Sequence, residues 1–492
     1  MDSVLPTPNR DRKGAGGPER FPMRKITIDP VTRIEGHARI TIHLDAEGSV
    51  ERTQFHVQQV RGFEKFTEGR PYYEMPGITA RICGICPVSH LLASAKACDG
   101  IMAVRIPPAA ALLREAVHCG QFVQSHALSF FHLSAPDLLL GMDADPERRN
   151  ILGLAAKHPD IAGDGIALRK FGQRVIERIA GERIHPSGIV PGGMAEPLSS
   201  AARDAILKEL PEARAIARRT LDLFLAILER FTAEVENFGK MPSLYAGLVG
   251  PAGELRLYDG RVRFANPDGS TAAEIDPSQY GAYIGEASLP DSYLKAPYFK
   301  PLGYPAGAYR VGPLARLNVA SQFGTPEADR ELTRFRNSFG PIVESSFHYH
   351  YARLIETIYC LERLEQLMQA PAILDKHVRA RAEVNSPEGI GVIEAPRGVL
   401  IHHYKVDERG AMVWANLVVA TGHNNLAMGR SIEQVSRAFV QGGKLQEGML
   451  NRVSAVVRAY DPCLSCSTHA DGTLPLRVEL YDASGAKLDE CS

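Results

Sequence analysis

The chain has 492 residues, of which 45% are hydrophobic, so it can bury a large core. Its 56 Lys and Arg nearly balance its 57 Asp and Glu, and a net charge of −1 gives no electrostatic reason to expect nucleic acid or an anionic membrane as a partner. No apolar run reaches the roughly 18 residues of a membrane span, and residues 1–23 lack the apolar core of a secretory signal. We therefore expect a protein that is not an integral membrane protein and that begins with a flexible arm over residues 1–23.

The first third of the chain predicts strands followed by helices. Apolar and polar residues alternate in three runs between residues 24 and 61, which indicates three strands. A short helix is expected after Gly62 and another over residues 89–104. Apolar residues recur at helical intervals over residues 107–140, which predicts a longer helix there.

The remaining two thirds predict a mixture of long helices and short strands. In chain order we expect a long helix over 199–238, short strands within 242–315, a long helix over 326–368, a hairpin over 390–421, helices over 433–439 and 447–459, and a terminal strand pair. No internal repeat, low-complexity block or Gly/Ser linker divides the chain. The sequence therefore predicts a helix-rich α+β fold in a single unit.

Two CxxC pairs carry the strongest chemical signal. Cys83 and Cys86 lie near the start, Cys463 and Cys466 lie near the end, and eight cysteines in so long a chain do not make a disulfide scaffold. Reduced thiols fit a cytoplasmic protein, and four thiolates suit zinc, iron–sulfur or another soft transition metal. Zinc ribbons place their pairs only about 15–20 residues apart. If the pairs share a metal, both ends of the fold must meet at one central site. A zinc site and two unrelated pairs remain open on spacing alone.

The residues around both pairs resemble a known family. Arg81-Ile-Cys-Gly-Ile-Cys-Pro-Val-Ser-His90 and Asp461-Pro-Cys-Leu-Ser-Cys-Ser-Thr-His469 are similar to the two signature motifs of nickel–iron hydrogenase large subunits. Further segments resemble the family in the family's order: VTRIEGH at 31–37, RGFE at 61–64, PGG at 191–193, EAPRG at 394–398 and LVVAT at 417–421. The resemblance covers about residues 24–469. It implies a central bundle of long helices with small peripheral β-sheets.

The resemblance also implies a catalytic centre of nickel and iron, with one CO and two cyanide ligands on the iron. Cys83 and Cys463 would be terminal ligands of nickel, and Cys86 and Cys466 would bridge the two metals. Soft thiolates suit both metals. The implied function is the catalytic subunit of a hydrogenase, an oxidoreductase that splits H2 reversibly and heterolytically into protons and electrons.

Proton transfer needs a base beside the metals, and the resemblance offers two candidates. These are the Cys463 thiolate and the Arg397 guanidine, with Asp461 as the acid beside Arg397. Arginine is a poor base because its pKa is so high, so the thiolate is the easier first acceptor. Glu35 matches the carboxylate that relays the proton outward. The alternative for Glu35 is a structural acid that binds a backbone amide.

Other matched residues would surround the metals. His90 resembles a hydrogen-bond donor to a bridging sulfur, and Thr421 and Arg397 match residues that contact a cyanide ligand. Glu64, His469 and the carbonyl of Leu417 match a site for Mg²⁺ (or Fe²⁺), for which oxygen ligands are suitable.

The sequence departs from the family pattern at two positions. Ser125 stands where some members have Asp, which thins the carboxylates around Arg397. Ala420 stands where others have Pro, which removes a close contact to one iron ligand.

Residues 470–492 follow the second motif and are interpreted as a C-terminal extension. In the family, a maturation endopeptidase cuts directly after the residue that matches His469, once nickel-insertion proteins have delivered the metal. We therefore expect a catalytic domain over residues 24–469 and loss of residues 470–492. The alternative is an ordinary terminal strand pair.

Electrons from H2 must leave through another chain, because the sequence has no further iron–sulfur motif and no dinucleotide fingerprint. We expect a small subunit with iron–sulfur clusters. Within the cytoplasmic branch of the family, we also expect diaphorase subunits that carry FMN and reduce NAD. The alternatives are a viologen-reducing type linked to a heterodisulfide reductase, a hydrogen sensor without turnover, a zinc-stabilised structural protein, and the quinone-site subunit of respiratory complex I. Retention of all four cysteines argues against the last.

Overall fold

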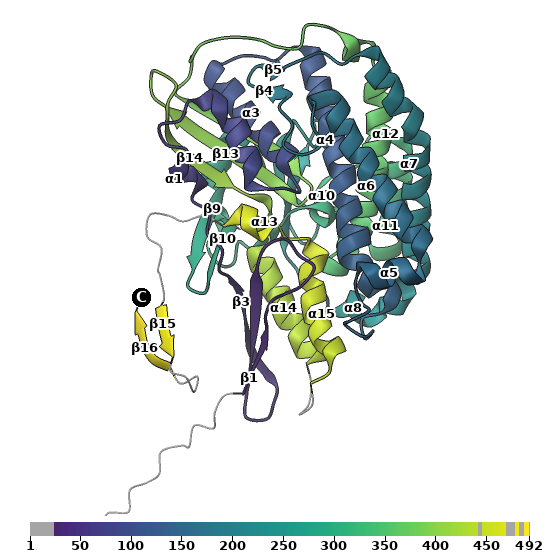
Figure 1. The fold of residues 1–492 in the computed structure, drawn as a ribbon. Helices are drawn as coiled ribbons and strands as arrows, with labels where there is room; N and C mark the ends of the chain where they lie inside the picture. Colours follow the sequence, from purple (N-terminus) through teal and green to yellow (C-terminus); the bar gives the residue numbers. More distant parts are fainter. Residues whose placement is uncertain (1–23, 441–444, 469–477, 482–486, 492) are drawn as a thin grey trace, which may run out of the picture.

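The computed structural model describes residues 24–440, 445–468, 478–481 and 487–491, and a bundle of long helices forms one side of it (Figure 1). The bundle helices are α4 (Pro108–Ala127), α6 (Pro159–Ala180), α7 (Ser200–Ile227), α11 (Pro326–Phe339) and α12 (Tyr349–Gln369). Helix α12 is buried along most of its length and packs against α4, α7 and α11. Proline occupies the first position of α4, α6 and α11, where its missing N–H costs no helical hydrogen bond.

Smaller helices complete the helical part of the fold. They are α1 (Phe63–Phe66), α2 (Met75–Thr79), α3 (Pro87–Met102), α5 (Ile151–Lys157), α8 (Thr232–Asn237), α9 (Tyr280–Tyr283), α10 (Pro313–Val319), α13 (Ala420–His423), α14 (Asn425–Phe439), α15 (Glu447–Tyr460) and α16 (Leu464–Ser467). Helix α4 continues into two π-helical segments, η3 (Leu128–Ser134) and η4 (Pro136–Leu140). The remaining short turns are 3₁₀-helical: η1 (Tyr72–Glu74), η2 (Ala80–Ile82), η5 (Leu228–Phe231), η6 (Pro277–Gln279), η7 (Lys300–Leu302), η8 (Ser346–His348) and η9 (Pro371–Leu374).

Small sheets lie beside the bundle. Strands β1 (Arg24–Ile28), β2 (Ala38–Leu44) and β3 (Val50–Val57) form one antiparallel sheet, and β12 (Glu388–Ala395), β13 (Gly398–Val406) and β14 (Met412–Val418) form another. A four-stranded sheet has the order β11 (Tyr309–Arg310), β6 (Leu244–Val249), β7 (Arg261–Ala265), β8 (Thr271–Ile275). Two-stranded sheets pair β4 (Ile189–Val190) with β5 (Gly193–Met194), β9 (Ile284–Leu289) with β10 (Ser292–Phe299), and β15 (Val478–Tyr481) with β16 (Lys487–Cys491).

The predicted helix-rich α+β unit is confirmed, but several element boundaries differ from the prediction. The single helix expected over residues 326–368 is wrong, because Gly340 takes a left-handed φ of 96° before Pro341 and separates α11 from α12. The helix expected over residues 199–238 is interrupted by η5. The hairpin over residues 390–421 is a three-stranded sheet, and the helix predicted from residue 433 begins at Asn425.

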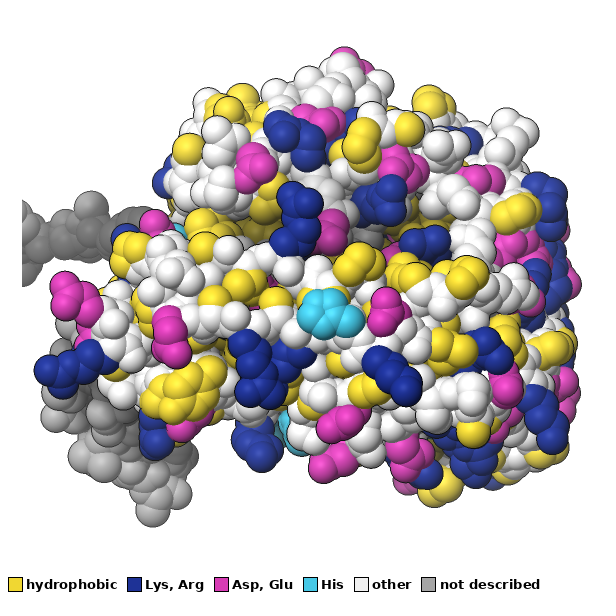
Figure 2. Space-filling model, turned by 90° about the horizontal axis from the view of Figure 1, so that it is seen from above, with side chains coloured by type: hydrophobic (Ala, Val, Ile, Leu, Met, Phe, Trp, Pro, Cys, Tyr) yellow, Lys and Arg dark blue, Asp and Glu magenta, His cyan; other side chains and the backbone are white. Residues whose placement is uncertain are grey.

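Packing of α3 across β12 and β13 fixes the place of the first cysteine motif, and α16 brings in the second. In the described part of the chain, no helix combines the length and the apolar content that a bilayer crossing requires. Positive and negative side chains are interspersed over the face that Figure 2 shows, as the near balance of charge leads one to expect.

Candidate metal centre

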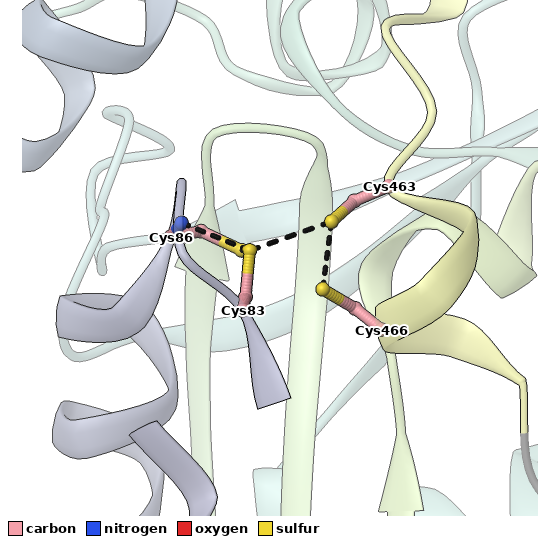
Figure 3. Close-up of side chains that lie close together, drawn as sticks. All are labelled: Cys83, Cys86, Cys463 and Cys466. Carbon is pink, nitrogen blue, oxygen red and sulfur yellow. Dashed lines mark hydrogen bonds between the residues drawn. The ribbon is translucent and has the colours of Figure 1, made fainter. Parts of the chain in front are cut away.

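Four cysteine sulfurs meet in the interior of the fold (Figure 3). Cys83 Sγ lies 3.4 Å from Cys463 Sγ, Cys86 Sγ lies 2.9 Å from Cys83 Sγ, and Cys463 Sγ lies 2.6 Å from Cys466 Sγ. All four sulfurs lie within 4.8 Å of one another. Each cysteine is at most 5% exposed, so the cluster is shielded from bulk water.

The first pair is positioned by the start of α3. Cys83 follows η2, and Cys86 is the residue that precedes Pro87 at the first helical position. The backbone N–H groups of Ile85 and Cys86 donate to Cys83 Sγ at 3.2 and 3.1 Å. These two bonds fix the position of the Cys83 sulfur beside the start of α3.

The second pair is positioned by the junction between α15 and α16. Asp461 ends α15 in a left-handed conformation with φ 54°, which redirects the chain so that Cys463 precedes the first turn of α16. Cys463 N donates to Thr421 Oγ1 at 2.8 Å, and Cys466 lies within α16. A short helix thus holds two sulfurs three residues apart on one side.

The cluster has the electrostatics of a cation site. Hydrogen bonds from Cys463, then Cys466 and Cys83, hold the pKa of Cys86 well below its ordinary value. Burial raises the pKa of Cys463 and Cys466 well above theirs. Four thiolates this close would repel one another in a buried site, so a bound metal cation is needed for all four to lose their protons. The soft donor set fits nickel and iron, and by geometry alone it also fits zinc.

Arg397 lies in the two-residue turn between β12 and β13, where Ala395 pairs with Gly398. Its Nε donates to the carbonyl of Asp461 at 2.6 Å, and its Nη2 lies 3.1 Å from the Asp461 carboxylate. Burial would lower the pKa of Arg397, but Asp461, Cys463 and two further cysteines outweigh burial and raise that pKa well above its ordinary value. Arg397 therefore stays protonated beside the sulfurs.

Glu35 lies in the loop between β1 and β2 and is half-buried. Its carboxylate accepts from Ser465 N at 3.1 Å and from the Ser465 hydroxyl, and its backbone bridges to Cys463. Gly36 permits this approach, since its φ is 89° and an added Cβ would lie 2.8 Å from Leu464 Cβ. The backbone-amide contact anticipated for Glu35 is thus present, and its half-buried carboxylate binds Ser465, which lies between Cys463 and Cys466 in the chain.

The other residues matched from the sequence lie on elements around the cluster. His90 follows Cys86 by one turn of α3 and is 1% exposed, and Thr421 lies in α13. Glu64 is half-buried in α1, which packs against β14, the strand that carries Leu417. His469 lies outside the described residues.

Both departures from the family pattern lie close to the cluster, and the structure shows two further contacts that the sequence analysis did not predict. Ser125 Oγ accepts from Arg397 Nη1 at 3.4 Å, and Ala420 is buried at the start of α13. Ser465 binds Glu35, and His402 binds His90. Ser465 lies within the second motif, and its position next to a cysteine is the sequence feature that could have indicated a role at the site. For His402, the sequence feature that could have indicated a role is its position on a strand, four residues after Gly398.

Comparison with known proteins identifies the class of protein that this fold and site define. A model described as nickel-dependent hydrogenase matches residues 61–157 and 268–469, and a model described as HoxL-like matches residues 25–60. The chain belongs to the nickel–iron hydrogenase large-subunit family and is the catalytic subunit of such an enzyme, an oxidoreductase acting on H2.

Individual relatives place the chain more narrowly. It is 41% identical to the NAD-reducing hydrogenase HoxS subunit beta of Cupriavidus necator, over 95% of this chain and 99% of that protein. It is 43% identical to one chain of the F420-non-reducing hydrogenase vhu of Methanocaldococcus jannaschii, over 85% of this chain and all of that protein. A crystal structure of an NAD⁺-reducing [NiFe]-hydrogenase in the H2-reduced state superposes with a TM-score of 0.88 at 44% identity, over 91% of this chain and 99% of that chain. The family match and the four clustered sulfurs together indicate a nickel–iron centre rather than zinc.

Proposed function

We propose that Cys83 and Cys463 are terminal ligands of nickel, and that Cys86 and Cys466 bridge nickel to an iron with CO and cyanide ligands. The observation that supports this assignment is the cluster of four buried sulfurs within 4.8 Å. When bound, the centre supplies the redox chemistry by which H2 is cleaved into protons and electrons. The chain's own residues hold the centre, exclude water and move the proton.

The thiolate of Cys463 takes the first proton. Arg397 is the competing base, but its pKa is raised well above the ordinary value, so it keeps its own proton at every pH where the enzyme works. Asp461 holds the guanidinium by its backbone carbonyl and its carboxylate. Arg397 therefore acts as a fixed positive charge and hydrogen-bond donor beside the diatomic ligands.

Glu35 carries the proton outward from Cys463. Its half-buried carboxylate lies next to the motif that contains the sulfur, and Ser465 holds both carboxylate oxygens. A carboxyl group between a buried thiol and the surface can accept a proton on one side and release it on the other.

Two further roles are proposed for residues around the centre. Thr421 Oγ1 accepts from Cys463 N, which leaves the hydroxyl hydrogen of Thr421 to donate to a cyanide ligand. Glu64, the carbonyl of Leu417 and His469 hold Mg²⁺ (or Fe²⁺). Helix α1, which carries Glu64, packs on β14, which carries Leu417, and this packing supports the proposal that the two residues lie close together.

Residues 24–469 form the working catalytic domain, and residues 470–492 are removed by a maturation endopeptidase after nickel insertion. Two observations support this boundary. The hydrogenase family match ends at residue 469, and within the described residues β15 and β16 pair only with each other. Residues 1–23, the proposed N-terminal arm, lie outside the described residues.

Electrons leave to an iron–sulfur small subunit that docks over the first cysteine motif. A pocket of about 750 Å³ is lined by residues that include Phe66, Tyr73 and Arg81, and Arg81 lies only two residues before Cys83. Phe66 is 60% and Tyr73 61% exposed. Aromatic side chains around a recess are typical of protein interfaces, and Arg81 joins this recess to the segment that contains the first cysteine motif.

From the small subunit, electrons pass through FMN-carrying diaphorase subunits to NAD in the cytoplasm. The similarity to the HoxS beta subunit supports this acceptor. The similarity to the archaeal F420-non-reducing hydrogenases favours a second candidate, a viologen-reducing enzyme coupled to heterodisulfide reductase.

Elemental analysis and intact-mass spectrometry of the native complex test these proposals together. We expect about one nickel per chain, iron in excess, and a chain that ends at His469. Zinc without nickel in a chain that already ends at His469 would overturn the metal assignment. Nickel in an active chain of all 492 residues would overturn the cleavage. Reduction of NAD by H2 in the complex, against reduction of viologen dye alone, separates the two acceptors.

A further inference from the structure

Helix α3 and strand β13 bring two pairs of polar side chains face to face. His90 and Ser94 are one turn apart on α3, and His402 and Tyr404 are two residues apart on β13. Four residues of helix advance about 6 Å and two residues of strand about 6.6 Å, so the pairs match in spacing. Alternation along β13 turns His403 to the other side, where it contacts Tyr280 and Glu388.

The four side chains form a continuous hydrogen-bonded chain. His90 Nδ1 lies 3.1 Å from His402 Nε2, His402 Nδ1 lies 2.6 Å from the Tyr404 hydroxyl, and that hydroxyl donates to Ser94 Oγ at 2.8 Å. None of the four is more than 1% exposed. Water therefore does not compete for these bonds, and each donor and acceptor has a fixed partner.

The chain of bonds fixes where the protons lie. Burial raises the pKa of Tyr404 well above its ordinary value, so Tyr404 keeps its hydrogen and gives it to Ser94. Burial and the neighbouring His90 lower the pKa of His402 well below its ordinary value, so His402 is neutral and has one N–H. That N–H is Nδ1–H, which donates to the Tyr404 oxygen, and His402 Nε2 accepts from His90 Nδ1–H.

The hydrogen bond at His90 Nδ1 determines which ring nitrogen of His90 faces the metal centre. His90 also hydrogen-bonds Cys86, one of the four clustered cysteines. Because Nδ1 is occupied by His402, Nε2 is the ring nitrogen left for the sulfur, and it donates to a metal-bound thiolate of Cys86 when both ring nitrogens of His90 carry a hydrogen. We propose that His402 is a positioning residue, which holds the His90 imidazole by Nδ1 so that Nε2 stays on Cys86 Sγ. This inference rests on the proposed role of Cys86 as a bridging ligand.

Infrared spectroscopy of the assembled complex tests the inference without relying on turnover. Loss of a hydrogen bond to a bridging sulfur leaves more electron density on the iron, which lowers the stretching frequency of its CO ligand. We expect H402Q to lower that frequency in the same direction as H90Q, and the double variant to match H90Q alone. The matched control H403Q, on the opposite face of the same strand, is expected to leave the frequency unchanged.

The possible outcomes distinguish failure of this inference from failure of the proposed function on which it rests. If H402Q keeps the wild-type frequency while H90Q shifts it, His402 does not position His90 and the inference is wrong. If H402Q fails to load nickel, Y404F decides, because it preserves the His402 ring and removes only the acceptor of Nδ1–H. An unshifted CO band in loaded Y404F would also overturn the inference. Absence of CO and cyanide bands from the wild-type complex would instead overturn the proposed iron ligands.

Discussion

The contact between the Glu35 loop and the second cysteine motif depends on Gly36. Replacing Gly36 with alanine measures how much free energy this contact contributes. Gly36 has φ 89°, and an added Cβ would lie 2.8 Å from Leu464 Cβ and 3.0 Å from Ser465 N. A non-glycine residue in the left-handed region costs roughly 1–2 kcal/mol, and overpacking of a tight contact costs about 1–3 kcal/mol more. We therefore expect G36A to weaken this contact by about 2–5 kcal/mol.

Gly48 provides the matched control. Its φ is 86°, almost the same as that of Gly36, but an added Cβ there would meet nothing within 4 Å. G48A therefore carries the backbone strain without the clash, and the difference between the two variants isolates about 1–3 kcal/mol of steric contact.

Amide hydrogen exchange at Leu464 is the assay, since Leu464 N donates to the Glu35 carbonyl at 3.2 Å. A loss of about 1–3 kcal/mol in local stability accelerates exchange by roughly 5- to 150-fold in G36A relative to G48A. Turnover should fall in parallel in G36A, because the carboxylate of Glu35 moves away from the sulfurs. Equal exchange at Leu464 in both variants would refute the close approach and its role in placing Glu35.

Three further predictions concern single side chains. E35Q can still accept from Ser465 N with its amide oxygen and donate to the Ser465 hydroxyl with its NH2, but it cannot exchange a proton. H2 oxidation should therefore fall by roughly 100-fold or more at unchanged nickel content, and full activity with a viologen dye would exclude the relay. R397K keeps a positive charge but loses the fork that binds Asp461, and we expect a loss of roughly 100-fold in dye-linked turnover, which wild-type rates in loaded R397K would contradict. Burial raises the pKa of Glu394 from 4.5 to about 7, so the folded state retains a proton that the unfolded chain has lost. The contribution of Glu394 to the free energy of unfolding is then fully present below about pH 4.5, and it declines by on the order of 3 kcal/mol as the pH rises through about 7. E394Q should remove this pH dependence from thermal unfolding midpoints measured between pH 5 and 7.5. A wild-type midpoint that does not change over this range would show that Glu394 is ionised in the fold.

The sequence was most informative where a contact is local or a motif is short. Cys83 and Cys86, or Cys463 and Cys466, are near neighbours in the chain, and the turn between them is set by residues within a few positions. The three strands over residues 24–61 follow from alternation alone, because each pairs with its neighbour in the chain.

Other features were missed because a local signal was masked or because they depend on contacts that a linear pattern does not contain. Helical periodicity continues across residues 326–368, and the break between α11 and α12 was a local signal that this periodicity masked, because Gly340 is followed directly by Pro341. Helix α6 was not predicted, although its apolar side packs on α4, because its many charged residues weaken the apolar signal. The bond between His90 and His402 joins residues 312 positions apart, and neither residue alone indicates it.

The meeting of Cys83 with Cys463 joins positions 380 residues apart in the chain. During synthesis the first pair therefore leaves the ribosome long before the second pair has been made, and two cysteines just before α3 are not enough to hold both metals. A chain that stops early, or that misfolds in its last helices, lacks half of the ligands. The centre thus serves as a check on completeness, because only a polypeptide translated to its end and folded throughout can acquire the metals that make it an enzyme.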